Sequence, residues 1–167
     1  MKRIYLLLDA ENLLAVHRRE GTLAEGLRAL GDAVRGLGAE GAVVQGVAFC
    51  DADLCASVAW DLAELGVRTF VTGETGPDAS DRALTRYLET SLPDSAETVV
   101  IGSGDNYFAR SARRLRREGR AVEMLALPGS ISWELYAAVE HCTFVEPAAG
   151  QAAAAATHEV LEQQVAA

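Results

Sequence analysis

Short, continuously apolar runs alternate along this chain with longer segments in which apolar residues recur at helical spacing. A continuous rather than alternating apolar run is typical of a strand that is covered on both faces, as in a parallel sheet. Five such runs predict five strands: Ile4–Leu8, Ala42–Phe49, Val67–Val71, the beginning of Glu97–Phe108, and Ala121–Leu127. A sixth run at Thr143–Val145 predicts a short strand at the sheet edge.

The segments between these runs predict helices. Apolar residues recur every three or four positions between Thr22 and Gly38, and Thr22 with Glu25 forms a capping-box pattern at the start. Four further helices follow from caps and apolar spacing: Asp51 or Asp53 towards Gly66, Asp78 or Ser80 to about Leu92, about Tyr107 to Glu118, and Ser130 or Ser132 to His141. We interpret the segment around His17, between the first strand and Thr22, as a polar connection.

The alternation of predicted strands and helices indicates an α/β fold, a three-layer sandwich with a parallel sheet and helices on both faces. Asp9 and Asp105 each follow an apolar strand at its carboxyl end. If the first and fourth strands are neighbours, as at the switch point of a doubly wound sheet, the two carboxylates meet in one crevice. Asp81, in the first turn of the helix before the fourth strand, reaches the same rim.

Composition limits the class of protein. The 167 residues are 50% hydrophobic, which suits one domain, predicted for residues 1–147, followed by an Ala-rich tail at residues 148–167. The 15 Lys and Arg against 24 Asp and Glu give a net charge of −9, which argues against binding nucleic acid by broad electrostatics alone. A nuclease is still allowed, because carboxylates that collect a divalent cation are part of the negative total.

The cysteines and the N-terminus bear on location. The three cysteines form no Cys-x-x-Cys pair, which favours reduced thiols. The apolar run after Lys2 is too short for a signal peptide and is interrupted by Asp9, and no stretch approaches membrane-spanning length. We therefore expect a cytoplasmic protein without a membrane partner.

The candidate chemistry lies in the carboxylates. Asp9, Asp81 and Asp105 are hard oxygen donors without a Cys/His set nearby, so Mg²⁺ or Mn²⁺ is the ion that they would suit. Each also has a structural alternative, since an aspartate at a strand end or helix start caps free backbone N–H groups. Asn12 can likewise be either a helix cap or a site residue. Asp78 is an alternative to Asp81 as the acidic site residue near the start of this helix.

Four motifs follow the predicted strand ends and helix starts. They are Leu8-Asp-Ala-Glu-Asn-Leu13, Ser80-Asp-Arg-Ala-Leu84, Ser103-Gly-Asp-Asn-Tyr-Phe108 and Ser132 to Leu135. From about Lys2 to Val145 the chain with these motifs resembles the NYN domain family of PIN-like nucleases. The resemblance implies a sheet of order 3-2-1-4-5 and RNA cleavage with Mg²⁺ or Mn²⁺. It also implies that Asp9, Asp81 and Asp105 are catalytic and bind the metal, that Asn12 positions a ligand or phosphate, and that Ser103 contacts the metal's water or the backbone.

Two departures from the family pattern leave a second function open. Tyr87 and Tyr107 stand where the family often has further aspartates, which leaves fewer carboxylates for a second ion. The alternative to a nuclease is therefore a catalytically weakened or inactive module that binds RNA or a protein partner. A haloacid-dehalogenase-like phosphatase, with Asp9 as nucleophile, is disfavoured because Glu11 stands at its second aspartate and Lys2 is the only lysine.

RNA is the predicted substrate. Arg82 and Arg86 lie in the helix predicted to start near the acidic residues, where they could orient the substrate's phosphates. The six arginines in residues 110–120 are interpreted as a solvated helix face, with guidance of a phosphate backbone as the alternative. Trp60 and Trp133 leave room for the surface of a homodimer.

Overall fold

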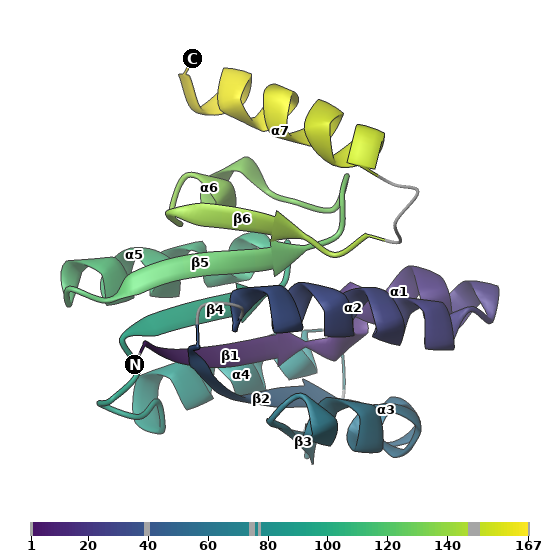
Figure 1. Ribbon diagram of the computed structural model, residues 1–167. Helices are drawn as coiled ribbons and strands as arrows, with labels where there is room; N and C mark the ends of the chain where they lie inside the picture. The colour runs from purple at the N-terminus through teal and green to yellow at the C-terminus, as the bar shows by residue number, and fades with distance from the viewer. Residues whose placement is uncertain (1, 39–40, 74–75, 77, 147–150, 167) are drawn as a thin grey trace.

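A parallel sheet of six strands forms the centre of the computed structural model, which describes residues 2–38, 41–73, 76, 78–146 and 151–166 (Figure 1). The strands are β1 (Arg3–Asp9), β2 (Val43–Cys50), β3 (Val67–Val71), β4 (Thr98–Gly102), β5 (Ala121–Ala126) and β6 (His141–Phe144). Their order in the sheet is β3-β2-β1-β4-β5-β6. The predicted order 3-2-1-4-5 with a short sixth strand is therefore confirmed, and β1 and β4 are neighbours.

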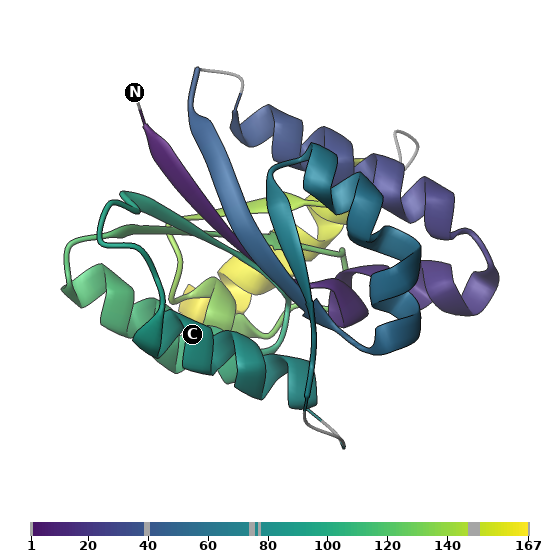
Figure 2. The same ribbon diagram turned by 90° about the horizontal axis from the view of Figure 1, so that it is seen from below.

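Helices cover both faces of the sheet, so the predicted three-layer sandwich is also confirmed (Figure 2). One face carries α1 (Ala10–Glu20), α2 (Leu23–Leu37) and α3 (Ala52–Glu64). The other carries α4 (Ala79–Thr90), α5 (Ala109–Arg117) and α6 (Trp133–Tyr136), with a single 3₁₀ turn, η1 (Asn106–Phe108), before α5. Parallel strands joined by crossover helices require this arrangement, because each strand must be covered on both sides.

The side chains of β1 alternate between the two layers of the core. Ile4, Leu6 and Leu8 belong to the apolar cluster shared with α1 to α3, whereas Tyr5 and Leu7 belong to the cluster shared with α4 to α6. Successive side chains of a strand point to opposite faces. By this parity the next residue, Asp9, lies on the same side of the sheet as α4.

Helix α1 corrects the interpretation of this segment as a polar connection. Asp9 Oδ1 accepts a hydrogen bond from Asn12 N at 3.1 Å, so the residue that ends β1 also caps the helix that follows. Leu13 and Leu14 are fully buried on the core side, and the helix ends at Gly21, which has a φ of 72°. The apolar stripe of α1 is narrow, and the polar residues around it concealed the helical spacing.

Two predicted caps are wrong in detail. Thr22 stands before α2 but makes no side-chain cap, because its hydroxyl instead hydrogen-bonds with His17 Nδ1 at 2.9 Å. Asp78 precedes α4, with a φ of 59°, and likewise makes no side-chain cap. Asp51 and Ser132 do cap their helices, accepting hydrogen bonds from backbone N–H groups three residues ahead.

The helix predicted up to His141 is much shorter in the structure. Helix α6 ends at Tyr136, and the chain then turns so that Glu140 N donates a hydrogen bond to Val122 O at 2.7 Å. This bond places the following residues beside β5, where they form β6. Backbone pairing with β5 at the sheet edge is therefore favoured over the helix that the apolar spacing of residues 137–141 predicts.

The C-terminal tail forms a helix, α7 (Gln151–Ala166), which lies beside α6 at the β6 edge of the molecule (Figure 1). Leu161 is buried, and His158 Nδ1 hydrogen-bonds with Tyr136 Oη at 2.6 Å. The tail thus has its own contacts with the domain, while the division into residues 1–147 and 148–167 stays a prediction. Within the described ranges, no helix combines the length and apolar character that crossing a bilayer requires.

Candidate active site

The carboxyl ends of β1 and β4 lie at the same level of the sheet. Leu8 pairs with Gly102 as the last partners of the β1–β4 ladder, so the residues that follow them, Asp9 and Ser103, are brought together. Ser103 Oγ donates a hydrogen bond to Asp9 Oδ2 at 3.3 Å. The first and fourth strands are therefore neighbours, and a hydrogen bond between side chains 94 residues apart joins their ends. That the carboxylates of Asp9 and Asp105 meet in one crevice stays a prediction.

Asp9 is buried at this edge, with only 4% of its surface exposed. Both of its carboxylate oxygens accept hydrogen bonds, from Asn12 N and from Ser103 Oγ. Burial raises the pKa of Asp9 from its ordinary value of 3.8 to about 7, and the nearby negative charge of Asp81 raises it further against the opposing effect of Asn12 N. Asp9 therefore has the environment of a carboxylate that lacks a compensating positive charge.

Asp81 reaches the same place from the first turn of α4. Its side chain is 6% exposed, and its Oδ1 atom is buried without a hydrogen-bond partner. Burial raises the pKa of Asp81, and the charge of Asp105 adds to this effect. Asp78, the competing acidic position, is exposed instead, so the geometry favours Asp81 as the site residue.

Asp105 stands at the rim, on the loop between β4 and α5. It is exposed, and its Oδ1 accepts a hydrogen bond from Tyr107 N at 2.8 Å, which makes it the cap of η1. Its backbone N donates to Ser103 Oγ at 3.2 Å. Asp105 therefore caps η1, and its charge also raises the pKa of Asp81.

Asn12 and Ser103 connect the two loops rather than project freely into solvent. Asn12 Oδ1 accepts a hydrogen bond from Gly104 N at 3.3 Å, and Ser103 is fully buried. Sequence reasoning missed Gly104, whose position between Ser103 and Asp105 is the signal that could have found it. A Cβ at this glycine would lie 1.7 Å from Ser130 O, so the loop can approach the segment before α6 only with glycine here.

The two candidate substrate-binding arginines lie on α4 after Asp81. Arg82 is half-buried and Arg86 is exposed, and both interact with other residues of the structure. Arg86 lines a cavity of about 260 Å³ together with Tyr87 and Phe49. Tyr87 hydrogen-bonds through its hydroxyl with Tyr5 at 2.6 Å and packs against the apolar core. The substrate-binding roles of both arginines stay predictions.

The residues present fit a divalent cation in one specific sense. Two buried carboxylates with raised pKa values, and one carboxylate oxygen without a partner, form an environment that a positive ion would complete. Mg²⁺ commonly keeps several waters and takes only one or two protein carboxylates. Among the described residues, no three His, Cys, Asp or Glu side chains gather closely enough to hold an ion by themselves. The ligand set of Asp9, Asp81 and Asp105 therefore stays a prediction.

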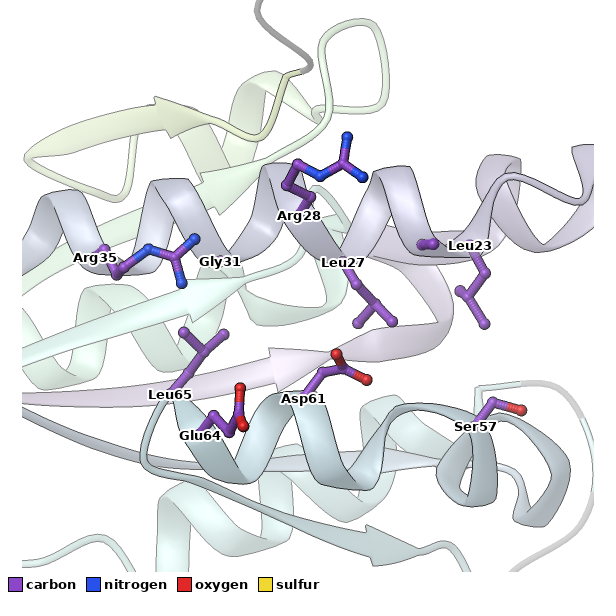
Figure 3. Close-up of a pocket in the computed structure, with 10 residues that line it drawn as sticks. Leu23, Leu27, Arg28, Gly31, Arg35, Ser57, Asp61, Glu64 and Leu65 are labelled. Carbon is purple, nitrogen blue, oxygen red and sulfur yellow. The ribbon is translucent and has the colours of Figure 1, made fainter.

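A groove between α2 and α3 is a separate feature of the surface (Figure 3). It has a volume of about 480 Å³, with leucine side chains between the two helices, arginines on the α2 side and carboxylates on the α3 side. The predicted site residues are absent from its described lining, so the groove is not part of the candidate active site. Trp60, also on α3, is 79% exposed, and Trp133 is 47% exposed; the homodimer stays a prediction.

Comparisons with known proteins place this geometry in context. The family model of the NYN domain matches residues 3–146. Among solved structures, a protein of unknown function from Vibrio parahaemolyticus superposes with a TM-score of 0.67 and 17% sequence identity. The match covers 87% of this chain and 93% of that chain, and at this identity it shows the shared fold alone. The comparison with curated proteins gives no match.

Proposed function

This chain belongs to the NYN domain family, of the PIN-like nuclease superfamily, and from that premise we propose that it is a Mg²⁺- or Mn²⁺-dependent endoribonuclease. Family membership points to a nuclease-type hydrolase in general. The observation that carries the finer proposal is the buried pair of Asp9 and Asp81, with Asp81 Oδ1 left without a hydrogen-bond partner. Two desolvated carboxylates are costly unless a cation or a proton compensates them, so their survival together suits a metal-dependent reaction.

Each residue has a stated part in this proposal. Asp9 and Asp81 would hold the ion, with Asp105 at the rim as the predicted third ligand. When bound, a divalent ion supplies charge neutralisation for the phosphate and lowers the pKa of the attacking water. Ser103 holds the Asp9 carboxylate through its hydroxyl, and Asn12 fixes the loop that carries Asp105 through its bond to Gly104 N.

Substrate orientation falls to the polar groups around the pair. Arg82 and Arg86 are proposed to contact phosphates near the site, because arginine presents paired N–H donors that match phosphate oxygens. Placement and charge stabilisation are the main contributions that a protein makes to phosphodiester hydrolysis. The proposal therefore asks the protein only for a fixed acidic pair, an ion and oriented phosphates.

A non-catalytic module that binds RNA or a protein partner is the second candidate. The observation in its favour is that Tyr87, which stands where the family resemblance leads us to expect an aspartate, hydrogen-bonds with Tyr5 and packs against the apolar core. Tyr107 departs from the expected pattern in the same way. The phosphatase alternative gains no support. Glu11, at the position of its second aspartate, accepts a hydrogen bond from Asp51 N at 2.8 Å and so helps to place the start of α3.

The decisive experiment incubates labelled mixed-sequence RNA with wild type, Asp9→Asn and Asp81→Asn, each with Mn²⁺ or with EDTA. We expect cleavage by the wild type with Mn²⁺ only, reduced at least about 100-fold in each variant, since loss of one charge-stabilising group costs about that much. Asp61→Asn, an exposed carboxylate on α3, is the matched control and should cleave like the wild type.

The outcomes separate the two candidates. RNA that is bound but not cleaved, with binding unchanged by EDTA, would favour the non-catalytic module. Cleavage that persists in EDTA or in both aspartate variants would contradict the proposed metal-dependent site. The melting temperature of every variant should be measured beside the assay, so that loss of activity is not confused with loss of fold.

A further inference from the structure

Helices α4 and α5 border a second groove, on the same face of the sheet as Asp81. Its volume is about 320 Å³, and its lining includes Thr85 from α4 and Tyr107 from η1. Thr85 lies one helical turn after Asp81, and Tyr107 lies two residues after Asp105. The groove is therefore lined by residues close in sequence to Asp81 and Asp105 and by residues of α5. Helices α4 and α5 both lie on one side of the sheet (Figure 2).

Arginines of α5 line this groove. Arg110, Arg114 and Arg117 follow a spacing of four and three residues, which places them on one side of the helix. This cluster of positive charges contrasts with the net charge of −9 of the whole chain. Such a local positive stripe raises the concentration of anions near it even on an acidic protein.

The three arginines differ in how they are held. Arg114 is fixed across the groove, because its Nη2 donates to Leu88 O on α4 at 3.1 Å and its Nη1 pairs with Glu118 at 3.0 Å. Arg117 donates through Nε to Arg113 O, a neutral carbonyl. Among the described residues, no carboxylate neutralises Arg110 or Arg117, so both charges are available to a ligand.

The other groups of the lining differ in how well they suit a nucleotide chain. Tyr107 is 43% exposed and stands edge-on to Phe108, with ring centres 6.0 Å apart, so its ring is accessible in the groove. Thr85 Oγ1 is buried without a hydrogen-bond partner. Glu89 is the one acidic residue described in the lining, and it opposes an anion in the part of the groove that α4 provides.

We propose that the α4–α5 groove binds the sugar-phosphate backbone of single-stranded RNA next to the cleavage site, with Arg110 and Arg117 on phosphates and Tyr107 stacked on a base. Arginines that follow a backbone, together with an exposed aromatic ring, are the elements by which proteins hold single strands. A duplex keeps its bases stacked inside and offers none to Tyr107. The inference rests on the proposed function for its choice of RNA, but the binding that it describes needs no metal.

The test measures binding of a fluorescently labelled single-stranded RNA of mixed sequence by anisotropy, in EDTA so that no cleavage occurs. We expect Arg110→Ala/Arg117→Ala to bind at least about tenfold more weakly than the wild type. The slope of log K against log salt concentration should become shallower by about 1.4, as two phosphate contacts on a single strand predict. Tyr107→Ala should weaken binding without changing this slope.

The matched control is Arg113→Ala/Arg116→Ala, which removes the same charge from α5. These two arginines contact Glu134 O and Glu140 instead of lining the groove, so the control should bind nearly as the wild type does. Equal weakening by the two double variants, no weakening by either, or absence of RNA binding by the wild type would overturn the proposal. A duplex of the same sequence that binds as tightly as the single strand would also overturn it.

The proposed function is tested separately in the same series. Asp9→Asn should bind RNA in EDTA as the wild type does and lose cleavage in Mn²⁺. RNA binding that depends on the groove arginines, without cleavage by the wild type, would support the proposed RNA-binding groove and contradict the proposed nuclease activity. Cleavage by Arg110→Ala/Arg117→Ala at the wild-type rate and affinity would contradict the proposed RNA-binding groove and support the proposed nuclease activity.

Discussion

Leu8 and Asp9 are consecutive residues of β1, and both are almost completely buried, at 0% and 4% exposure. Leu8 packs in the apolar cluster beneath α1 to α3, where burial of such a side chain contributes about 1.5–3 kcal/mol. Asp9 lies at the carboxyl edge, where the same burial raises its pKa to about 7. Equal burial thus stabilises the fold at one residue and opposes it at the next when the carboxylate is charged.

The two residues differ in what surrounds the strand at each position. The body of β1 is covered by helices on both sides, whereas its end is closed by polar loops and by the first turn of α4. Ser103 and Asn12 supply hydrogen bonds there, but the surroundings supply no positive charge that pairs with Asp9 or Asp81 in the described contacts. A fold retains such a cost where function requires it, and stabilises itself elsewhere.

The largest expected effect comes from the apolar half of this comparison. Leu8→Ala should lower the free energy of unfolding by about 2–5 kcal/mol, because it removes buried methyl groups and leaves a cavity in a layer that cannot fully close. Urea denaturation at pH 7 measures the change. Val16→Ala, at a position 38% exposed on α1, is the control and should stay within about 0.5 kcal/mol. A loss below about 1 kcal/mol at Leu8 would show that the core is looser than described.

The second effect concerns the charged half and depends on pH. Because the pKa of Asp9 is about 7 in the folded protein and near 3.8 when unfolded, the folded state holds the proton to higher pH. The stability that this group contributes is complete below pH 4 and is lost as the pH rises to 7 and above, by at most about 4 kcal/mol. Metal-free wild type should therefore lose stability relative to Asp9→Asn across this window.

Urea titrations in EDTA at pH 4, 5.5, 7 and 8 give the comparison. The difference between variant and wild type should be near zero at pH 4 and should grow in favour of Asp9→Asn as the pH rises. A constant difference at all four values would mean that Asp9 ionises normally in the folded state. Asp61→Asn, exposed on α3, should show no such trend.

The apolar half of the comparison could be predicted from the sequence, whereas the pairing of the first and fourth strands was implied by the family resemblance. Continuous apolar runs indicated β1 and β4 as buried parallel strands, and parallel strands place Asp9 and Asp105 at the same edge of the sheet. Helix α1 escaped prediction because its apolar stripe is narrow, and because Asp9 serves both as the end of β1 and as the cap of the helix. A single residue with two local roles gives no separate signal for the second.

The particular environment of Asp81 lay beyond sequence reasoning. An aspartate in the first turn of a helix is equally consistent with a cap, and Asp78 offered the same pattern three residues earlier. Only the packing of α4 against the sheet determines that Asp81 Oδ1 is buried without a partner while Asp78 is exposed. Burial of one side chain depends on contacts between distant segments, which local pattern does not encode.

The third prediction concerns the binding of a divalent cation, which would supply the positive charge that Asp9 and Asp81 lack. Mg²⁺ or Mn²⁺ at about 100 times its dissociation constant should stabilise the wild type by about 2.7 kcal/mol if it binds only the folded protein. For a chain of this size that corresponds to a rise in Tm of roughly 5–10 °C, measured by calorimetry at pH 7.5. Asp9→Asn/Asp81→Asn should show no rise. An equal rise in wild type and double variant would place the ion elsewhere on the protein.

The smallest effect comes from the hydroxyl that joins the two strand ends. Ser103 Oγ donates to Asp9 Oδ2 and accepts from Asp105 N, so Ser103→Ala removes two hydrogen bonds and leaves their partners to find others at the crevice. We expect a loss of about 1 kcal/mol in the free energy of unfolding, since a single hydrogen bond is worth about that much and the Asp105 N–H lies near solvent. Ser111→Ala, another buried serine, removes a hydroxyl of the same size from α5, away from Asp9, and is the control.

The informative measurement on Ser103→Ala is metal binding rather than stability alone. If the hydroxyl orients the Asp9 carboxylate, the variant should need several-fold more Mn²⁺ for the same rise in Tm, while Ser111→Ala should match the wild type. Supporting hydrogen bonds of metal ligands commonly carry an effect of about 10-fold or more in affinity. A variant that loses stability but titrates with Mn²⁺ as the wild type does would make Ser103 a link between β1 and β4 only, and would leave the orientation of Asp9 to Asn12 N.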